Sequence, residues 1–277
     1  IAEYLSFGKW VDRGWPSYDF PSEHFINSVT GQFMNQYRLF VPYQQKKRKT
    51  IFERFVIGSA DQFCMVNTPE KYAEKFEIRN LGACGESWTG DGLGTKVNYD
   101  GGPQNIKDEN WLSCVIRITY GDFSYYTGGD LPGGYYERKP YEFNTDFETP
   151  VAEVCGPVTA MRANHHAVNN STNYNQLRLL DPQTILITSA KFTQPDHSAL
   201  LRMTDQMVVP GKRDIFCNCD AAKGTVAPVY YDNIKAIGHI VLRVYEGGRT
   251  YQVYILDNTD PSYPVKYVTD VRCSKRR

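Results

Sequence analysis

Two short segments of the chain carry residues that could bind a metal ion. Gly128-Gly129-Asp130 follows a predicted β-hairpin, and Asn164-His165-His166 follows the next predicted strand. Because residues that end neighbouring strands of one sheet lie side by side at its carboxyl edge, we expect Asp130 and the histidine pair to converge. A carboxylate and an imidazole placed there are suitable ligands for zinc or a similar ion. The alternative is an ordinary polar surface loop in which the His-His dipeptide has no special role.

The two histidines of the pair allow different roles. His165 lies nearer the end of the strand, so we predict it as the nitrogen ligand beside the oxygen ligand Asp130. His166 is then the catalytic residue, acting as acid or base, or it donates a hydrogen bond that orients a metal ligand. The reverse assignment stays open, as does an Asp130 carboxylate that bridges two ions. The other histidines are expected to be structural or to pack near the site: His24, His197 and His239.

The elements that must position these residues are clearest after Leu112. Leu112 to Thr119 and Phe123 to Thr127 predict a hairpin with a turn at Gly121-Asp122. Strands and helices then alternate, which is typical of a layered α/β domain. Strands are expected at 158–163, 184–189 and 213–217, helices at 174–180 and 196–208, and a closing hairpin at 239–245 and 250–256.

The first part of the chain is less regular. Apolar residues recur at helical spacing from Ser22 to Phe40, and we expect Pro42 to end that helix. The segment 82–108 is rich in Gly, Asn and Asp and is expected to be a long loop. Within it, Gly90–Lys96 superficially resembles a phosphate-binding loop but lacks the flanking strand and helix. Strands are also predicted at 52–57 and 63–66, and a short helix after Thr68.

The composition argues against two classes of partner. Lys+Arg and Asp+Glu both number 31, so the formally neutral chain of 277 residues has no general attraction for nucleic acid or anionic membranes. No apolar run approaches the roughly 18 residues that a membrane-spanning helix needs. The basic run at 44–49 is expected to be a solvated linker rather than a site for an anion.

The cysteines and tyrosines bear on the compartment. Seven cysteines without a C-x-x-C pair argue against a disulfide framework and a zinc ribbon, and we expect most of them to be buried as small hydrophobic residues. The 20 tyrosines and the glycosylation sequons at Asn169 and Asn170 favour a secreted or periplasmic protein.

The run from Asn110 to Asp130 resembles the competence-type, DNA-uptake-protein-like branch of the metallo-β-lactamase superfamily. In that branch a hairpin of the form N-x-x-S-x-x-x-x-x-x-x-G ends in a T-G-D aspartate that binds metal, and a later strand ends in H-H-G-S. Here the histidine pair is followed by Ala167-Val168. Leu180 to Ser189 is similar to the family's L-x-P-x-x-x-x-I-S strand. The resemblance covers roughly residues 110 to 260, including a histidine before the last helix and the closing hairpin that begins Gly238-His239-Ile240.

The resemblance implies an α/β fold, the αββα sandwich of the metallo-β-lactamase type. It places 1–277 in a single domain, in which 1–109 is a helix and long-loop region and 110–260 is the C-terminal half of the sandwich. The family's H-x-H-x-D-H loop does not occur in this sequence. Because Trp10 to Pro16 is similar to a segment downstream of that loop, we expect the domain to be incomplete at its N-terminal side.

The same resemblance implies a metal-dependent hydrolase that uses zinc or manganese and acts on phosphodiesters or another small molecule. Without the signature loop, we expect weak or no metal binding and no reliable turnover from this chain. The alternative is a catalytically silent binding or scaffold protein that keeps the fold. Its tryptophans would then stack on sugars or bases, although core packing explains them equally well. They are Trp10, Trp15, Trp88 and Trp111.

Overall fold

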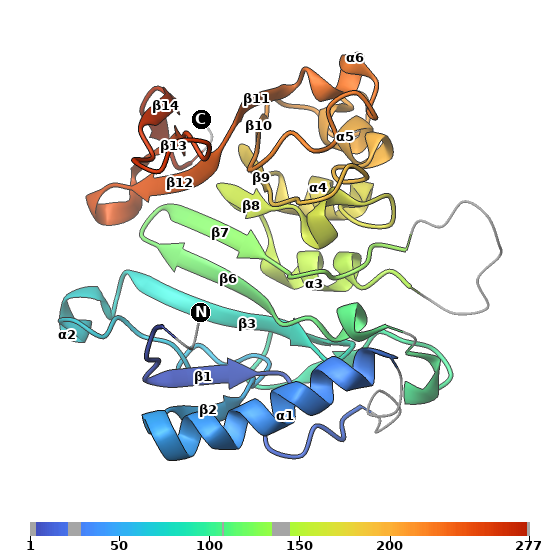
Figure 1. The fold of residues 1–277 in the computed structure, drawn as a ribbon, viewed down its shortest axis with the longest axis vertical. Helices are drawn as coiled ribbons and strands as arrows, with labels where there is room; N and C mark the ends of the chain where they lie inside the picture. Colours follow the sequence, from blue (N-terminus) through green and yellow to red (C-terminus); the bar gives the residue numbers. More distant parts are fainter. Residues whose placement is uncertain (1–3, 22–28, 107, 135–144, 276–277) are drawn as a thin grey trace.

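A nine-stranded mixed sheet forms the centre of the molecule, in the order β11-β10-β9-β8-β7-β6-β3-β4-β5 (Figure 1). The structure is a computed structural model and describes residues 4–21, 29–106, 108–134 and 145–275. The strands are β3 (Phe76–Ala83), β4 (Glu86–Trp88), β5 (Thr95–Val97), β6 (Val115–Tyr120), β7 (Phe123–Thr127), β8 (Ala160–Arg162), β9 (Thr184–Ile187), β10 (Asp214–Cys217) and β11 (Ile234–Ile237). The chain is therefore a mixed α/β protein, as its sequence predicts.

One half of the sheet is parallel and is wound in sequence order. Strands β7 to β11 pair in parallel, each with the next. Because crossovers between parallel strands are right-handed, a sequential order places the connecting helices on one face of the sheet. Val151, Leu177 and Leu200 of these helices pack into one core with strand residues such as Met161 and Ile185. The helices are α3 (Glu148–Cys155), α4 (Tyr174–Leu180), α5 (His197–Thr204) and α6 (Pro228–Tyr231).

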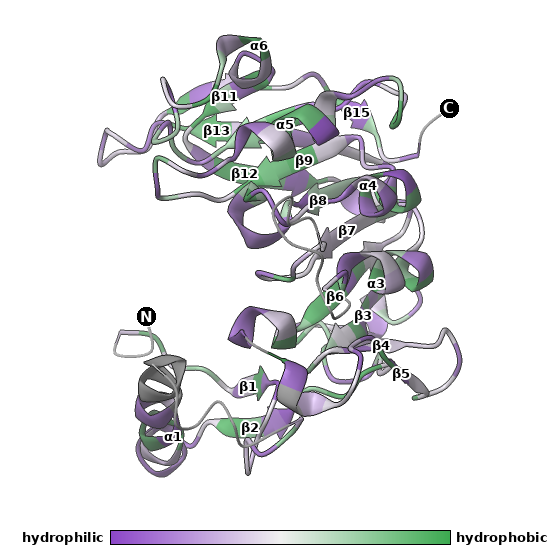
Figure 2. Ribbon diagram, turned by 90° about the vertical axis from the view of Figure 1, so that its right-hand side faces the viewer, coloured by the Kyte–Doolittle hydropathy of each residue, from purple (hydrophilic) through white to green (hydrophobic). Residues whose placement is uncertain are grey.

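A smaller antiparallel sheet covers the other face. Its residues are alternately buried and less buried along β13, so that Tyr251, Val253 and Ile255 form one apolar face. This face packs against Phe123 and Phe216 of the central sheet, and the strands of this region are coloured as hydrophobic in Figure 2. The layers are thus helix, sheet and sheet. The small sheet comprises β12 (His239–Val244), β13 (Thr250–Leu256), β14 (Val265–Val268) and β15 (Arg272–Cys273).

The N-terminal elements pack at the antiparallel end of the central sheet (Figure 1). Strands β1 (Lys9–Asp12) and β2 (Ile51–Arg54) form a parallel pair, joined by α1 (Val29–Arg48). A third core, centred on residues such as Phe55 and Leu112, joins this region to the sheet. The short helix α2 (Pro69–Tyr72) follows.

The central and C-terminal elements confirm much of the sequence-based prediction. The helix at 174–180 and both predicted hairpins are present, although β6 begins at Val115 rather than Leu112. The prediction of a strand at 63–66 is wrong, and Val66 is 88% exposed. None of the described helices is long and apolar enough to cross a bilayer.

Two further expectations for the first part of the chain are corrected. The segment 82–108 contains β4 and β5, because the pairing of β4 with β3 and of β5 with β4 overrides its weak local preference for strand. Gly90–Gly94 lies between these two strands, and Thr95 and Lys96 begin β5, so the segment is the loop of a β-hairpin and not a phosphate-binding loop. Helix α1 continues through Pro42 to Arg48, with Val41 and Gln44 buried, so packing compensates for the helix bond that proline cannot make. The basic run at 44–49 accordingly lies mostly in the last turns of a helix rather than in a linker.

Candidate functional site

The turn after β7 delivers Asp130 to the edge of the sheet. Gly129 has a φ of 59°, and a side chain at Gly128 would lie 2.6 Å from Tyr126 Oη. Both positions therefore require glycine, because one is left-handed and the other lies against a buried side chain. The Asp130 backbone N–H donates to Ser113 Oγ at 3.2 Å, which fixes the residue at the end of its turn. The Asp130 carboxylate is 31% exposed.

The two histidines lie in an unusual turn after β8, within the 3₁₀ segment η4 (Asn164–Ala167). His165, His166 and Ala167 have φ values of 46°, 59° and 58°, so three consecutive residues with side chains are left-handed. Such backbone costs about 1–2 kcal/mol per residue and persists only where surrounding contacts hold it. One of these contacts is a hydrogen bond of 3.0 Å from the His165 N–H to Gly129 O, which ties the histidine turn to the aspartate turn.

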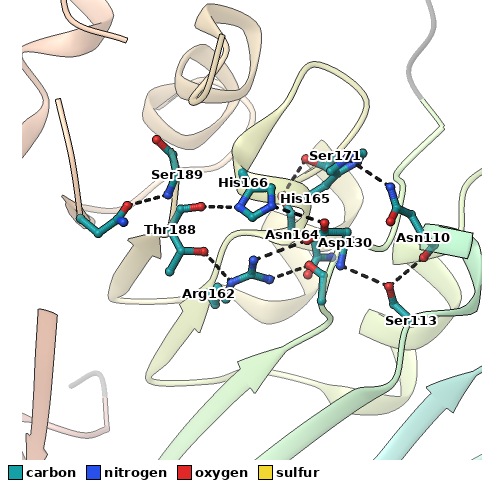
Figure 3. Close-up of polar contacts among 12 residues, drawn as sticks. Asn110, Ser113, Asp130, Arg162, Asn164, His165, His166, Ser171, Thr188 and Ser189 are labelled. Carbon is teal, nitrogen blue, oxygen red and sulfur yellow. Dashed lines mark hydrogen bonds and ion pairs between the residues drawn. The ribbon is translucent and has the colours of Figure 1, made fainter. Parts of the chain in front are cut away.

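Asp130 and His166 lie close together at the carboxyl edge of the parallel strands (Figure 3). The sequence predicts this convergence for Asp130 and one of the two adjacent histidines. His166 Nε2 lies 3.3 Å from Asp130 Oδ2. The opposite ring nitrogen, Nδ1, donates to the backbone carbonyl of Thr188, just beyond β9. Since a carbonyl only accepts, Nδ1 carries the hydrogen, and Nε2 of a neutral ring presents its lone pair to the carboxylate. A proton or a metal cation between these two atoms removes the repulsion.

Arg162 connects Asp130 to the ends of both strands that flank β8. It is the last residue of β8, and its three nitrogens reach both neighbouring strand ends. Nε donates to Thr188 Oγ1 at 2.8 Å, Nη1 donates to Gly129 O at 2.6 Å, and Nη2 lies 3.5 Å from Asp130 Oδ1 (Figure 3). The side chain is only 17% exposed. Asp130 therefore has one oxygen toward a guanidinium and the other toward an imidazole.

His165 points to a different partner. Its Nε2 lies 3.3 Å from the Asn110 side-chain nitrogen, and its Nδ1 is buried with no hydrogen-bond partner among the described residues. Burial lowers the pKa of His165 below its usual value, and the positive charge of a protonated His166 would add to this effect. His165 is thus a neutral imidazole near pH 7. The structure separates the two histidines, and it places His166 rather than His165 against Asp130.

A buried carboxylate supports the turn from within the protein. Glu148, the first residue of α3, is fully buried and accepts hydrogen bonds from Asn164 Nδ2 (2.9 Å), Thr172 N (2.6 Å) and Asn173 N (2.7 Å). Asn173 caps α4, so Glu148 joins two helices to the start of the histidine turn. Loss of hydration raises the pKa of Glu148 to about 7, although the donated hydrogen bonds act in the opposite direction.

Two other histidines, His197 and His239, take no part in this network. His197 begins α5, has a 65% exposed side chain and lies 3.6 Å from Asp196. His239 stacks edge-on against Tyr263, with ring centroids 5.2 Å apart. His24 falls outside the described residues.

The tryptophans and cysteines also take structural positions. Trp10 and Trp15 pack against Phe52, and Trp111 packs against Phe147, which agrees with core packing. All seven cysteines are free, but three are buried rather than most: Cys84, Cys155 and Cys217. The prediction that most of the cysteines are buried is therefore wrong.

Sequence reasoning missed several residues of the network. Arg162 and Glu148 drew no prediction, because their partners are brought near only by the fold. Asn110 and Ser113 stand at the first and fourth positions of the N-x-x-S pattern, and that pattern was the available signal. Ser113 Oγ also donates to Asn110 O at 2.8 Å, so the two residues form one unit.

The separation of His166 and Asp130 suits two ligands of one metal ion. Two ligands of a tetrahedral zinc ion, each about 2.0–2.1 Å from it, lie about 3.3 Å apart, which matches the separation of His166 Nε2 and Asp130 Oδ2. Within the part of the chain that the structure describes, no group of three or more His, Cys, Asp or Glu side chains could hold a metal. A third ligand would have to come from elsewhere.

Comparisons with known proteins add no family. No protein-family model matches the chain, and a search of curated proteins finds no relative.

Proposed function

We propose that the chain carries part of a divalent-cation site of a metal-dependent hydrolase, with phosphodiesters as the substrate class that the sequence resemblance implies. The observation that carries the proposal is the close approach of the His166 imidazole to the Asp130 carboxylate. Its Nε2–Oδ2 separation of 3.3 Å suits two ligands of one ion, and the Thr188 carbonyl fixes the tautomer that leaves Nε2 free to bind. The layering of helix, sheet and sheet agrees with three of the four layers of an αββα sandwich.

His165 and His166 exchange the roles first predicted for them. His166 becomes the nitrogen ligand beside Asp130, because its Nε2 is directed at the carboxylate. His165 becomes a neutral imidazole whose Nε2 accepts a hydrogen bond from the Asn110 amide, so it packs beside the site without binding the ion. A bound zinc or manganese ion would supply Lewis acidity and a water that ionises near neutral pH. Arg162 and Ser113 hold Asp130 in position.

A titration of the 277-residue chain with Zn²⁺ tests the proposal. Long-range ¹H–¹⁵N spectra of the imidazoles report which nitrogen changes, and calorimetry reports the affinity. We expect the His166 Nε2 signal to shift and the affinity to be weak, because the described residues offer two ligands. Asp130→Asn and His166→Gln should abolish binding. His197→Gln, at an exposed histidine outside the network, is the matched control and should bind as the parent does.

Two outcomes would count against the proposal. If no imidazole signal responds to Zn²⁺ at millimolar concentration, the site does not bind metal and the hydrolase proposal fails. If His165→Gln abolishes binding while His166→Gln does not, the metal site stands but the first assignment of the two histidines is the correct one.

A catalytically silent binding or scaffold protein is the second candidate. It is favoured by the charge balance around Asp130, where the guanidinium of Arg162 already neutralises the carboxylate without a metal. The same spectra separate the candidates. In the silent protein, no imidazole signal responds to Zn²⁺.

A further inference from the structure

Two cysteines, Cys217 and Cys219, lie beside the strand end that anchors His166. Cys217 is the last residue of β10 and is buried, whereas Cys219 is partly exposed. Both thiols approach the hydroxyl group of Ser189, just beyond β9. Cys219 Sγ lies 3.3 Å from Ser189 Oγ. Burial raises the pKa of the Cys217 thiol to about 11, and a hydrogen bond with the same hydroxyl group acts in the opposite direction.

The chain between the two cysteines is short enough for a disulfide. Two residue steps of fully extended backbone span at most about 7 Å. The chain bends at Asn218, which shortens the distance from Cys217 to Cys219. Disulfides join residues whose Cα atoms lie about 4.4–6.8 Å apart. Because both side chains also face the same hydroxyl group, the two sulfurs can meet with little movement of the backbone.

The different exposure of the two thiols determines the order in which they react. The thiolate is the form that attacks a disulfide. Burial raises the pKa of Cys217 from 9.0 to about 11, so its thiolate is about a hundredfold rarer near pH 7 than that of an ordinary cysteine. Cys219 can meet a reagent from solvent, whereas Cys217 can meet a group that is already attached to Cys219. Cys219 is therefore the attacking thiol and Cys217 the resolving thiol.

We infer that Cys217 and Cys219 form a reversible disulfide by exchange with a small disulfide such as oxidised glutathione. The Cys219 thiolate attacks one sulfur of the reagent, which breaks its S–S bond and releases one glutathione. Cys217 then loses its proton and attacks the Cys219 sulfur of the mixed disulfide, which releases the second glutathione. The two protein thiols give up two electrons and two protons, and one glutathione disulfide becomes two thiols. The inference goes beyond the proposed function and does not depend on metal binding.

The disulfide changes what holds the strand end beside the histidine turn. In the reduced protein, Cys219 Sγ donates to Ser189 O at 3.1 Å, and Asn218 Oδ1 accepts a hydrogen bond from Ser189 N. The preceding residue, Thr188, carries the carbonyl that accepts from His166 Nδ1 (Figure 3). Oxidation removes the hydrogen from Cys219 Sγ, so the Ser189 carbonyl loses a donor, and it draws Asn218 into a small ring. The oxidised pair therefore loosens the backbone that orients the His166 imidazole.

Peptide mass spectrometry tests the inference on the full chain, after reaction with oxidised glutathione near neutral pH and blocking of free thiols in acid. Trypsin cleaves after Arg213 and Lys223, so Cys217 and Cys219 share one peptide that contains no other cysteine. In the parent, this peptide should lose two hydrogen atoms and resist the blocking reagent. Cys217→Ser should instead retain one glutathionyl group on Cys219, because no thiol resolves it. Cys219→Ser should stay unmodified at Cys217, and Cys64→Ser, at an exposed cysteine of another segment, should react as the parent does.

Imidazole ¹⁵N spectra, recorded before and after oxidation, measure the effect on the histidine turn. The His166 signals should shift in the parent and in Cys64→Ser, and they should return when a dithiol reductant is added. They should not shift in Cys219→Ser, which cannot form the disulfide. Circular dichroism checks that each protein is folded in both states.

Three outcomes would overturn parts of the inference. If the folded parent keeps both thiols while the exposed Cys64 gains glutathione, the pair is not a redox site and the inference fails. If Cys219→Ser gains glutathione on Cys217 as readily as Cys217→Ser does on Cys219, the order of the two thiols is wrong. If the disulfide forms and the His166 signals stay in place, the effect on the histidine turn is refuted. None of these results depends on the Zn²⁺ titration, so the proposed function stands or falls separately.

Discussion

Replacing Glu148 by glutamine should change how the stability of the protein depends on pH. Glu148 is fully buried, and the loss of hydration raises its pKa from 4.5 to about 7 in the folded protein. In the unfolded chain the residue titrates near 4.5. Between these two values the folded state binds a proton that the unfolded state does not. The free energy of unfolding contributed by Glu148 therefore falls as the pH rises from about 4.5 to about 7.

The size of this effect follows from the shift. A difference of about 2.5 pKa units corresponds to about 3 kcal/mol, since each unit is worth about 1.4 kcal/mol. Glu148→Gln has no proton to lose, so its free energy of unfolding lacks this slope. The amide nitrogen of glutamine must also face one of the three N–H donors that now meet the carboxylate, which costs about 1–3 kcal/mol.

Urea unfolding followed by tryptophan fluorescence, at a series of pH values from 4 to 8, measures both quantities. We expect the parent's free energy of unfolding minus that of Glu148→Gln to fall by about 3 kcal/mol across the series. Glu153→Gln, at an exposed position of the same helix, should show no such change. A difference that stays flat, or that grows with pH, would show that the three donors outweigh burial and keep Glu148 ionised.

Two further variants probe the supports of the histidine turn. Arg202 is buried and donates to three backbone carbonyls of Asn169–Thr172, so Arg202→Met should lower the free energy of unfolding by about 3 kcal/mol, measured in urea; an unchanged midpoint would contradict that reasoning. Gly128→Ala places a methyl group 2.6 Å from Tyr126 Oη and should cost about 2 kcal/mol, whereas Gly8→Ala, with nothing within 4 Å, should be neutral in the same thermal scan. Equal melting temperatures for the two alanine variants would refute the steric argument.

The sequence predicted the parts of the site that depend on local order. The hairpin before Asp130 and the strand before His165 show clear patterns, and strand ends of one sheet must lie close together. The choice between the two histidines depends on the turn itself. Left-handed backbone at three residues with side chains has no local sequence signal, because such conformations are stabilised by contacts made elsewhere.

The missed residues share a second physical cause. Arg162 meets Gly129 across 33 positions of the chain, and Glu148 meets Thr172 across 24. Neither pairing has a periodicity or a motif, since each depends on which strands become neighbours. Similarly, β4 and β5 are short and rich in polar residues, and they exist because β3 offers an edge to β4, which in turn pairs with β5. Tertiary contacts, rather than local preference, determine these parts of the fold.

The left-handed turn at His165, His166 and Ala167 affects what happens when a ligand arrives. Flexible loops lose conformational freedom on binding, and that loss weakens their affinity. In this protein the backbone beneath both imidazoles is already confined during folding, at the expense of stability. Whatever occupies the edge beside Asp130 therefore meets rings whose orientation is set beforehand, so its affinity reflects the contacts themselves with little subtracted for ordering the chain.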